Sequence, residues 1–159
     1  MGIKSKSFLG RCSDYQKKYI KAIKHYQDAI ETVKLDPEYI DGFPRQLEYQ
    51  AFLCYSVMMS GNVKKGLKLS QIAYRDFDNT KDGKRLKSKD YTTWAIWKTG
   101  IAIRAVNTLV DVNSKLLTKD EMIEWIDEAK ELLTPPKGVK VWVDFGFRKT
   151  EVENIYKKL

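Results

Sequence analysis

Apolar residues recur every three or four positions along most of the chain, which is the spacing of one face of an α-helix. The pattern predicts helices over residues 13–35, 45–60, 63–77, 90–114 and 118–133. The segment 90–114 is apolar around most of its circumference, which is typical of a helix at the centre of a fold. Because only Gly61-Asn62 separates the second helix from the third, these two helices must fold back on each other as a hairpin.

Helix boundaries are marked by capping residues and by proline. Three pairs of residues have the spacing of a capping box and predict helix starts: Ser13 with Gln16, Thr118 with Glu121, and Thr150 with Glu153. The sequence Asp36-Pro37 predicts the end of the first helix, because the residue before proline avoids the helical conformation. The capping pair at 150–153 predicts a short last helix.

Residues 138–147 change the period of the pattern from helical to alternating. Apolar Val139, Val141, Val143 and Phe145 alternate with Lys140, Trp142 and Asp144. This alternation predicts a half-buried β-strand over 139–145. A single strand leaves its backbone groups unpaired, so we expect it to pair with the same strand of a second copy, with a bound peptide, or with the linker at 38–43.

Together these signals predict one mainly α domain over residues 1–159. It would contain five to six helices packed as antiparallel helical hairpins, with a short C-terminal β-segment. Residues 1–10 are predicted to form a flexible tail, residues 78–90 an exposed basic loop, and residues 134–159 the C-terminal strand and short helix. A chain of 159 residues can bury about 68–70% of its unfolded surface without disulfides or metals.

Composition indicates the cellular compartment in which we expect the protein. No apolar run approaches the roughly 18 residues of a membrane span, and the N-terminus lacks the apolar core of a secretory signal. Cys12 and Cys54 lie among apolar residues and outside any Cys-x-x-Cys, so we expect buried free thiols, although a disulfide between them stays open. We therefore expect a cytoplasmic protein that makes no contact with a membrane.

Charge is distributed in bands along the chain. The formal net charge is +8, with a net charge of +6 over residues 1–25 and +7 over 61–104, and of −4 over both 26–60 and 105–136. Alternating bands allow neighbouring helices to complement each other, or leave a basic face for an acidic partner.

Small residues recur on the second helix of each early pair. Two sets share the same spacing: Ala22, Tyr26 and Ala29, and Gly66, Ser70 and Ala73. Gly61 stands five residues before Gly66, at the predicted turn. Glycine inside a helix costs roughly 1 kcal/mol relative to alanine, so a close approach of two helices is the expected gain at Gly66.

Over about residues 10–75 this spacing resembles the tetratricopeptide repeat. The resemblance implies helical hairpins that bind peptides or proteins in a concave groove, where we would look for Lys17, Lys21, Lys64, Lys68 and Tyr55. Ser70 is not aromatic, as the repeat would have it, and the chain has no clean 34-residue period. A non-repeating helical domain is therefore the alternative.

Catalytic and metal-binding patterns are missing from the sequence. His25 has no evident partner for acid–base chemistry, and no set of His, Cys or carboxylate residues has metal-ligand spacing. Neither a phosphate-binding glycine loop nor a nucleophile elbow is present. We expect no cofactor, no metal and no catalytic residue.

The predicted basic loop suggests a second kind of function, the binding of nucleic acid. Five basic residues fall within nine positions: Lys81, Lys84, Arg85, Lys87 and Lys89. Lysines displace counterions from phosphates, and the following Tyr91 and Trp94 would stack on unpaired bases if exposed. The alternatives are a solvated loop and aromatic residues buried in the core.

Trp142 lies on the lysine side of the predicted strand, opposite the valines. An exposed tryptophan is a typical anchor of a protein interface, and a buried one would mean that both faces of the strand are covered.

The favoured hypothesis for the function is a non-catalytic adaptor whose basic face engages an acidic protein partner, including an inhibitor that masks a partner surface. The alternatives are a nucleic-acid-binding protein and a small enzyme with an unrecognised site.

Overall fold

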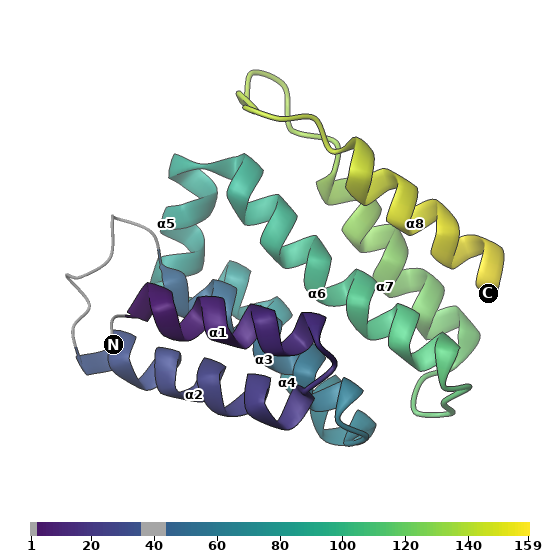
Figure 1. The fold of residues 1–159 in the computed structure, drawn as a ribbon. Helices are drawn as coiled ribbons and strands as arrows, with labels where there is room; N and C mark the ends of the chain where they lie inside the picture. Colours follow the sequence, from purple (N-terminus) through teal and green to yellow (C-terminus); the bar gives the residue numbers. More distant parts are fainter. Residues whose placement is uncertain (1–2, 36–43) are drawn as a thin grey trace.

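The computed structural model describes the backbone of residues 3–35 and 44–159 and, in those ranges, the side chains from Lys6 onward (Figure 1). The helices in these ranges are α1 (Ile3–Tyr15), α2 (Tyr19–Leu35), α3 (Arg45–Met59), α4 (Val63–Asn79), α5 (Lys81–Lys89), α6 (Tyr91–Asp111), α7 (Lys119–Leu132) and α8 (Gly146–Lys158). The described chain is all-helical. The expectation of five to six helices with a C-terminal β-segment is wrong, since these ranges hold eight helices and no strand.

The first four helices run back and forth, each antiparallel to the one before it (Figure 1). α1 occupies residues that the sequence predicted to be a flexible tail at 1–10. Gly10 lets α1 approach α2, because a Cβ atom at Gly10 would lie 2.6 Å from the ring of Tyr26. Ser7 and Ser13 are small, buried neighbours of Gly10 on α1. The buried side of α1 therefore carries glycine and serine, with Gly10 against the Tyr26 ring, and a search for apolar periodicity misses it.

The predicted capping box at Ser13 is a helix end instead of a helix start. Lys17 has a φ of 57°, its N–H donates to the carbonyl of Asp14 at 2.9 Å, and the N–H of Lys18 donates to the carbonyl of Ser13 at 2.8 Å. This is a Schellman motif, in which glycine usually holds the left-handed position. Because lysine and not glycine occupies the left-handed position, the sequence carries no signal that α1 ends before α2 begins.

The hairpin of α3 and α4 packs as its small residues predict. Gly61 has a φ of 97° and reverses the chain between the two helices. A Cβ atom at Gly66 would lie 2.7 Å from the backbone nitrogen of Met58 on α3. Ser70 and Ala73 are buried further along α4. The missing side chain of Gly66 thus brings the two helices into backbone contact.

The predicted loop at 78–90 is wrong, because α4 continues to Asn79 and α5 covers Lys81–Lys89. Thr80 caps α5, its Oγ1 accepting from the N–H of Gly83 at 3.1 Å. Gly83 is buried against the end of α4, where a Cβ atom would lie 2.6 Å from the carbonyl oxygen of Asp76. Leu86 is the one large apolar side chain in α5 and it is buried. One large apolar residue among nine is too few to give the periodic pattern that predicts a helix.

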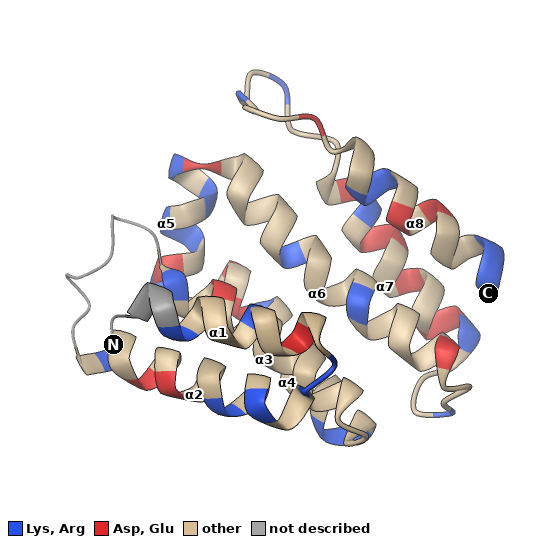
Figure 2. Cartoon of the chain, viewed as in Figure 1, with Lys and Arg blue, Asp and Glu red and all other residues tan. Residues whose placement is uncertain are grey.

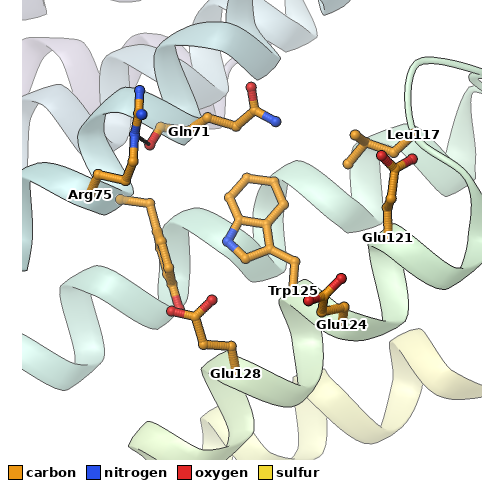
Figure 3. A pocket seen from close by; sticks show the side chains of 8 residues that line it. Gln71, Arg75, Leu117, Glu121, Glu124, Trp125 and Glu128 are labelled. Atoms are coloured by element: carbon orange, nitrogen blue, oxygen red, sulfur yellow. Dashed lines mark hydrogen bonds between the residues drawn. The ribbon is translucent and has the colours of Figure 1, made fainter.

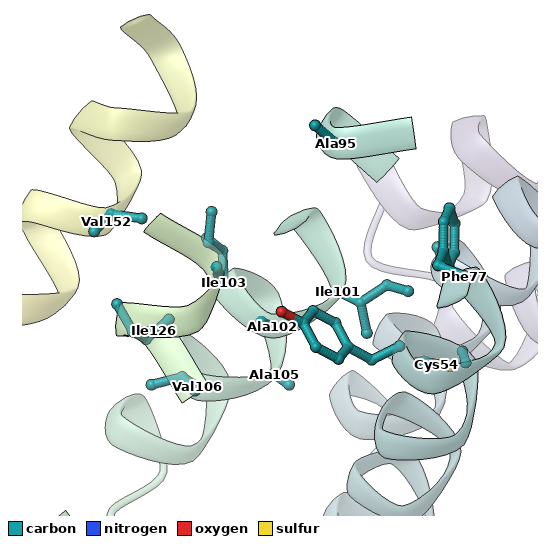
Figure 4. Close-up of a cluster of buried hydrophobic side chains, with 14 of the residues drawn as sticks. Cys54, Phe77, Ala95, Ile101, Ala102, Ile103, Ala105, Val106, Ile126 and Val152 are labelled. Atoms are coloured by element: carbon teal, nitrogen blue, oxygen red, sulfur yellow. The ribbon is translucent and has the colours of Figure 1, made fainter. Parts of the chain in front are cut away.

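α6 is the central helix, as its all-round apolar pattern predicts. It packs on α3, α4, α5, α7 and α8. Figure 4 shows Ala102, Ile103 and Val106 of α6 near Ile126 of α7 and Val152 of α8, with Phe77 of α4 on the other side. The core of the protein therefore lies around α6.

One charged side chain is held within this core. Lys98 of α6 is buried, and its ammonium pairs with the carboxylate of Asp78. The same ammonium lies 3.9 Å from a carboxylate oxygen of Glu128 and 4.3 Å from the centroid of the Tyr74 ring. Paired carboxylate and aromatic faces together compensate the buried positive charge.

α7 begins at the predicted capping box. The Oγ1 of Thr118 accepts from the N–H of Glu121 at 3.2 Å, and the Glu121 carboxylate accepts from the N–H of Thr118 at 2.6 Å. These hydrogen bonds lower the pKa of Glu121. The predicted helix at 118–133 is confirmed by α7.

The predicted strand at 139–145 is a loop with no regular secondary structure. Gly138, with a φ of 85°, turns the chain at its start. Val139, Val141 and Val143 are 37 to 38% exposed, whereas Phe145 is 3% exposed and anchors the loop to the core. No strand lies beside this loop in the described ranges, and the suggested pairing with residues 38–43 lies outside them. The alternation therefore reflects exposed valines beside polar residues, without a sheet.

No helix in the described ranges is long and apolar enough to cross a membrane.

Candidate functional site

Five of the partner-binding residues named from the sequence gather at one end of the first four helices. The turn between α1 and α2 and the turn between α3 and α4 lie at this end (Figure 1). We call the exposed lysines there the basic end: Lys17, Lys18, Lys21, Lys64, Lys65 and Lys68. Tyr55 lies nearby on α3, half-buried, with its ring edge-on to Tyr19 of α2 at 6.4 Å. Burial raises the pKa of Tyr55.

Trp142, the sixth residue, lies elsewhere. Its indole Nε1 donates to the Asp90 carboxylate at 3.0 Å, and its backbone N–H donates to the Oγ1 of Thr92 at 3.2 Å. Although fixed at these two points, Trp142 is 68% exposed. Because Asp90 directly follows α5, the indole lies at the C-terminal end of that basic helix.

Other exposed apolar side chains lie close to Trp142 in the chain. Phe147 at the start of α8 is 49% exposed, and three valines of the preceding loop are exposed as well. We call this group, together with the last turn of α5, the Trp142 surface: Lys87, Lys89, Val139, Val141, Trp142, Val143 and Phe147. It groups exposed apolar side chains near Trp142 in the chain with two exposed lysines of the helix that ends beside Asp90.

The five predicted nucleic-acid contacts all lie exposed on α5, where Figure 2 shows a concentration of basic residues. Arg85 forms an ion pair with Asp82 at 3.5 Å, and the Lys87 ammonium lies 4.3 Å from the centroid of Trp94. Tyr91 and Trp94 are buried, with Trp94 fully covered. They belong to the core and offer no stacking face to a base.

A pocket of about 470 Å³ opens between α4 and α7. Figure 3 shows Gln71 and Arg75 on α4 facing Trp125, Glu124 and Glu128 on α7. The ring of Trp125 meets Tyr74 edge-on, with centroids 5.6 Å apart. The remaining lining residues are Leu117 and Glu121. Aromatic rings and carboxylates dominate this pocket.

The Tyr74 hydroxyl in this pocket is buried beside the Glu128 carboxylate. Burial raises the pKa of Tyr74, and the Glu128 carboxylate raises it further through its charge and a side-chain hydrogen bond. Figure 2 shows acidic residues along α7, the helix that carries Glu128.

Two neighbouring arginines form a further cluster on α6 and α8. Arg104 lies over the ring of Phe52 at 5.6 Å, and none of the described ion pairs involves it. Burial and the charge of Arg148 lower the pKa of Arg104 to about 10. Gly100 leaves room for both groups, since a Cβ atom there would lie 2.6 Å from Arg148 Nη2 and 3.1 Å from Arg104 Nη1.

The remaining reactive side chains are dispersed. His25 is half-buried on α2. Cys12 is half-buried and Cys54 is buried, and both are free thiols; burial raises the pKa of Cys54 to about 12. Across residues 3–35 and 44–159, no group of three or more His, Cys, Asp or Glu side chains is arranged to hold a metal ion.

Comparison of the chain with protein-family models, curated proteins and solved structures finds no match. The resemblance to tetratricopeptide repeats therefore stays a prediction, and the function has to be inferred from the residues themselves.

Sequence reasoning missed the pocket and the arginine pair. Tyr74 and Trp125 are 51 positions apart, and Arg104 and Arg148 are 44 apart. No local motif joins either pair. The one available signal was the spacing of Glu121, Glu124 and Glu128, which places three carboxylates on one face of a helix.

Proposed function

We propose that the protein is a non-catalytic binding module that engages an acidic protein partner through the Trp142 surface. The observation that supports this most strongly is the position of Trp142, exposed but held by hydrogen bonds to Asp90 and Thr92. A fixed, exposed indole binds a partner with little loss of side-chain freedom, and tryptophan is enriched among residues that dominate binding energy.

The chemistry of the surface indicates the chemistry of the partner. The three exposed valines and Phe147 favour an apolar contact around the indole. Lys87 and Lys89 at the end of α5 favour carboxylates beside that contact, which would steer association and fix its orientation. We therefore expect a partner segment with apolar residues flanked by aspartate or glutamate.

The basic end is a second contact area under the same proposal. Its lysines are exposed on the two turns, and Tyr55 offers a partly buried ring near them. The resemblance to tetratricopeptide repeats supports peptide binding there by analogy of fold alone. A role as an inhibitor that masks a partner surface would use the same contacts.

Site-specific photocrosslinking tests the proposal. A photoreactive phenylalanine at position 142 should crosslink a protein in cell extract, and the same group at Leu35, which is exposed at the end of α2, serves as the control. The crosslinked protein is then purified and titrated in isolation. Lys87→Glu with Lys89→Glu, and separately Trp142→Ala, should each weaken binding, whereas Leu35→Ala should not. Equal crosslinking at both positions, or binding unaffected by these changes, would contradict the proposal.

Nucleic-acid binding is the second candidate, and five exposed basic residues on one short helix favour it. Anisotropy of labelled single-stranded RNA and duplex DNA at about 50 and 200 mM salt tests it, because phosphate contacts weaken steeply with salt. Binding that persists at the higher salt and collapses in Lys84→Glu with Arg85→Glu would favour this candidate over the protein partner. A small enzyme with an unrecognised site is the third reading.

A further inference from the structure

We propose that the pocket between α4 and α7 binds the cationic side chain of a lysine or arginine, presented by an extended basic segment of a partner protein. The pocket uses none of the residues of the Trp142 surface. The inference therefore goes beyond the proposed function and stands or falls separately from it.

The aromatic wall of the pocket suits a cation. Trp125 and Tyr74 meet edge-on, and the face of an aromatic ring attracts positive charge. The inner face of Tyr74 already carries the Lys98 ammonium at 4.3 Å. Trp125 is half-buried, and in the described chain no cation lies over its ring. Figure 3 shows its indole standing in the middle of the pocket.

The charges around the pocket are mainly negative. Glu121, Glu124 and Glu128 follow one face of α7, and Arg75 on α4 is the one basic residue in the lining. The Arg75 Nε donates to the carbonyl of Gln71 at 3.3 Å. Lys98 lies behind the wall, where its ammonium pairs with Asp78 and lies 3.9 Å from a carboxylate oxygen of Glu128. The lining therefore carries an excess of negative charge that a ligand cation would neutralise.

The Tyr74 hydroxyl adds a polar group to the buried wall of the pocket. The residue is 5% exposed, it lines the pocket, and its hydroxyl lies beside the Glu128 carboxylate. An ammonium or guanidinium group could donate one N–H to this oxygen, while the Glu128 carboxylate accepts a second N–H from the same group.

The shape of the pocket favours a side chain of a longer segment. α4 and α7 both pack on α6 and meet through the rings of Tyr74 and Trp125, and the pocket lies between the two helices. Its volume of about 470 Å³ exceeds what one lysine or arginine side chain fills. The neighbouring residues of an extended segment would occupy the rest, alongside Leu117 and Gln71.

Peptide titration followed by NMR tests the inference. Capped Gly-Ser-Lys-Ser-Gly is compared with the same peptide carrying arginine or neutral norleucine, which matches the length of lysine. The Trp125 indole N–H resonance is assigned with Trp125→Phe. Lysine and arginine peptides should shift it to saturation and norleucine should not. Glu124→Gln with Glu128→Gln should weaken binding about tenfold, whereas Glu153→Gln, an exposed change on α8, should not.

Three outcomes would overturn the inference. The first is an equal shift with norleucine, and the second is unchanged affinity in the doubly substituted variant with its fold intact by circular dichroism. The third is a shift of the Trp125 resonance with protein concentration in the absence of peptide, which would assign the pocket to a second copy of this chain. A failure of the Trp142 crosslinking experiment would leave all three readouts unaffected.

Discussion

Gly66 of α4 lies against the backbone of Met58 of α3, at a distance that leaves no room for a Cβ atom. Gly66→Ala is expected to lower the free energy of unfolding by about 1 to 3 kcal/mol. The two helices would have to separate, and this cost exceeds the roughly 1 kcal/mol that alanine gains in helix propensity. Urea denaturation of both proteins measures the difference.

Gly100→Ala is the matched control, because Gly100 lies in the middle of α6. A Cβ atom there would meet the guanidinium ends of Arg148 and Arg104 rather than backbone. Flexible side-chain ends can shift, so we expect a smaller loss than at Gly66. Equal losses at the two glycines would show that the backbone contact with Met58 is not the cause.

Lys17→Gly is expected to stabilise the protein by about 1 kcal/mol. Lys17 is held at a positive φ in the turn between α1 and α2, where a side chain costs about 1 to 2 kcal/mol and glycine does not. Thermal unfolding measures the gain. Lys21→Gly, within the first turns of α2, should instead destabilise. A lower Tm for Lys17→Gly would contradict the assigned turn.

Asp78→Ala should destabilise far more than Lys98→Met. Removing Asp78 leaves the buried Lys98 ammonium with Glu128 at 3.9 Å as its nearest remaining carboxylate, at a cost of about 2 to 3 kcal/mol. Methionine at position 98 removes the charge and keeps the length, so its effect should stay within about 1 kcal/mol. Chemical denaturation compares the two variants, and the reverse order would refute the explanation.

Stability should fall as pH rises from about 9 to 12. Burial raises the pKa of Cys54 from 9.0 to about 12, and it also raises the pKa values of Tyr26 and Tyr74. In this range the unfolded chain loses these protons and the folded protein keeps them, so unfolding becomes more favourable. Each such group contributes a slope of about 1.4 kcal/mol per pH unit.

Measuring Tm between pH 8 and 11 checks this dependence. Cys54→Ala removes one titrating group and should flatten the curve between its unfolded and folded pKa values. A curve identical to that of the unsubstituted protein would mean that the thiol does not contribute.

The long, strongly patterned helices could be predicted from the sequence because their signals are local. α6 is apolar on all sides, and α7 starts at a capping box whose two hydrogen bonds form as expected. The hairpin of α3 and α4 follows from Gly61 and the small face of α4. In each case propensity, pattern and packing agree.

The wrong secondary-structure predictions concern segments in which only one kind of sequence signal was present. α1 presents small and polar residues to Tyr26, so its buried face does not look apolar. α5 rests on Leu86 and on glycine packing at Gly83. The alternation at 139–145 suits a strand and an exposed loop equally, and only a neighbouring strand would have decided between them.

The candidate sites depended still more on the fold. The sequence left two alternatives for Trp142, exposed or buried. Its hydrogen bond to Asp90 joins residues 52 positions apart, so no local pattern could reveal it. The aromatic wall of the pocket consists of Tyr74 on α4 and Trp125 on α7, two helices that both pack on α6. Such sites appear only when distant segments meet.

The attachment of α1 and α2 has a consequence for how the molecule opens. These helices meet the rest of the described fold through α3, and a small separate core of Ala29, Ile30, Val33 and Tyr49 lies between α2 and α3. Backbone amides of α1 and α2 should therefore exchange their hydrogens with solvent through a partial opening that leaves α6 protected. Hydrogen-exchange mass spectrometry would then reveal two levels of protection along one chain, with the N-terminal pair as the unit that opens first.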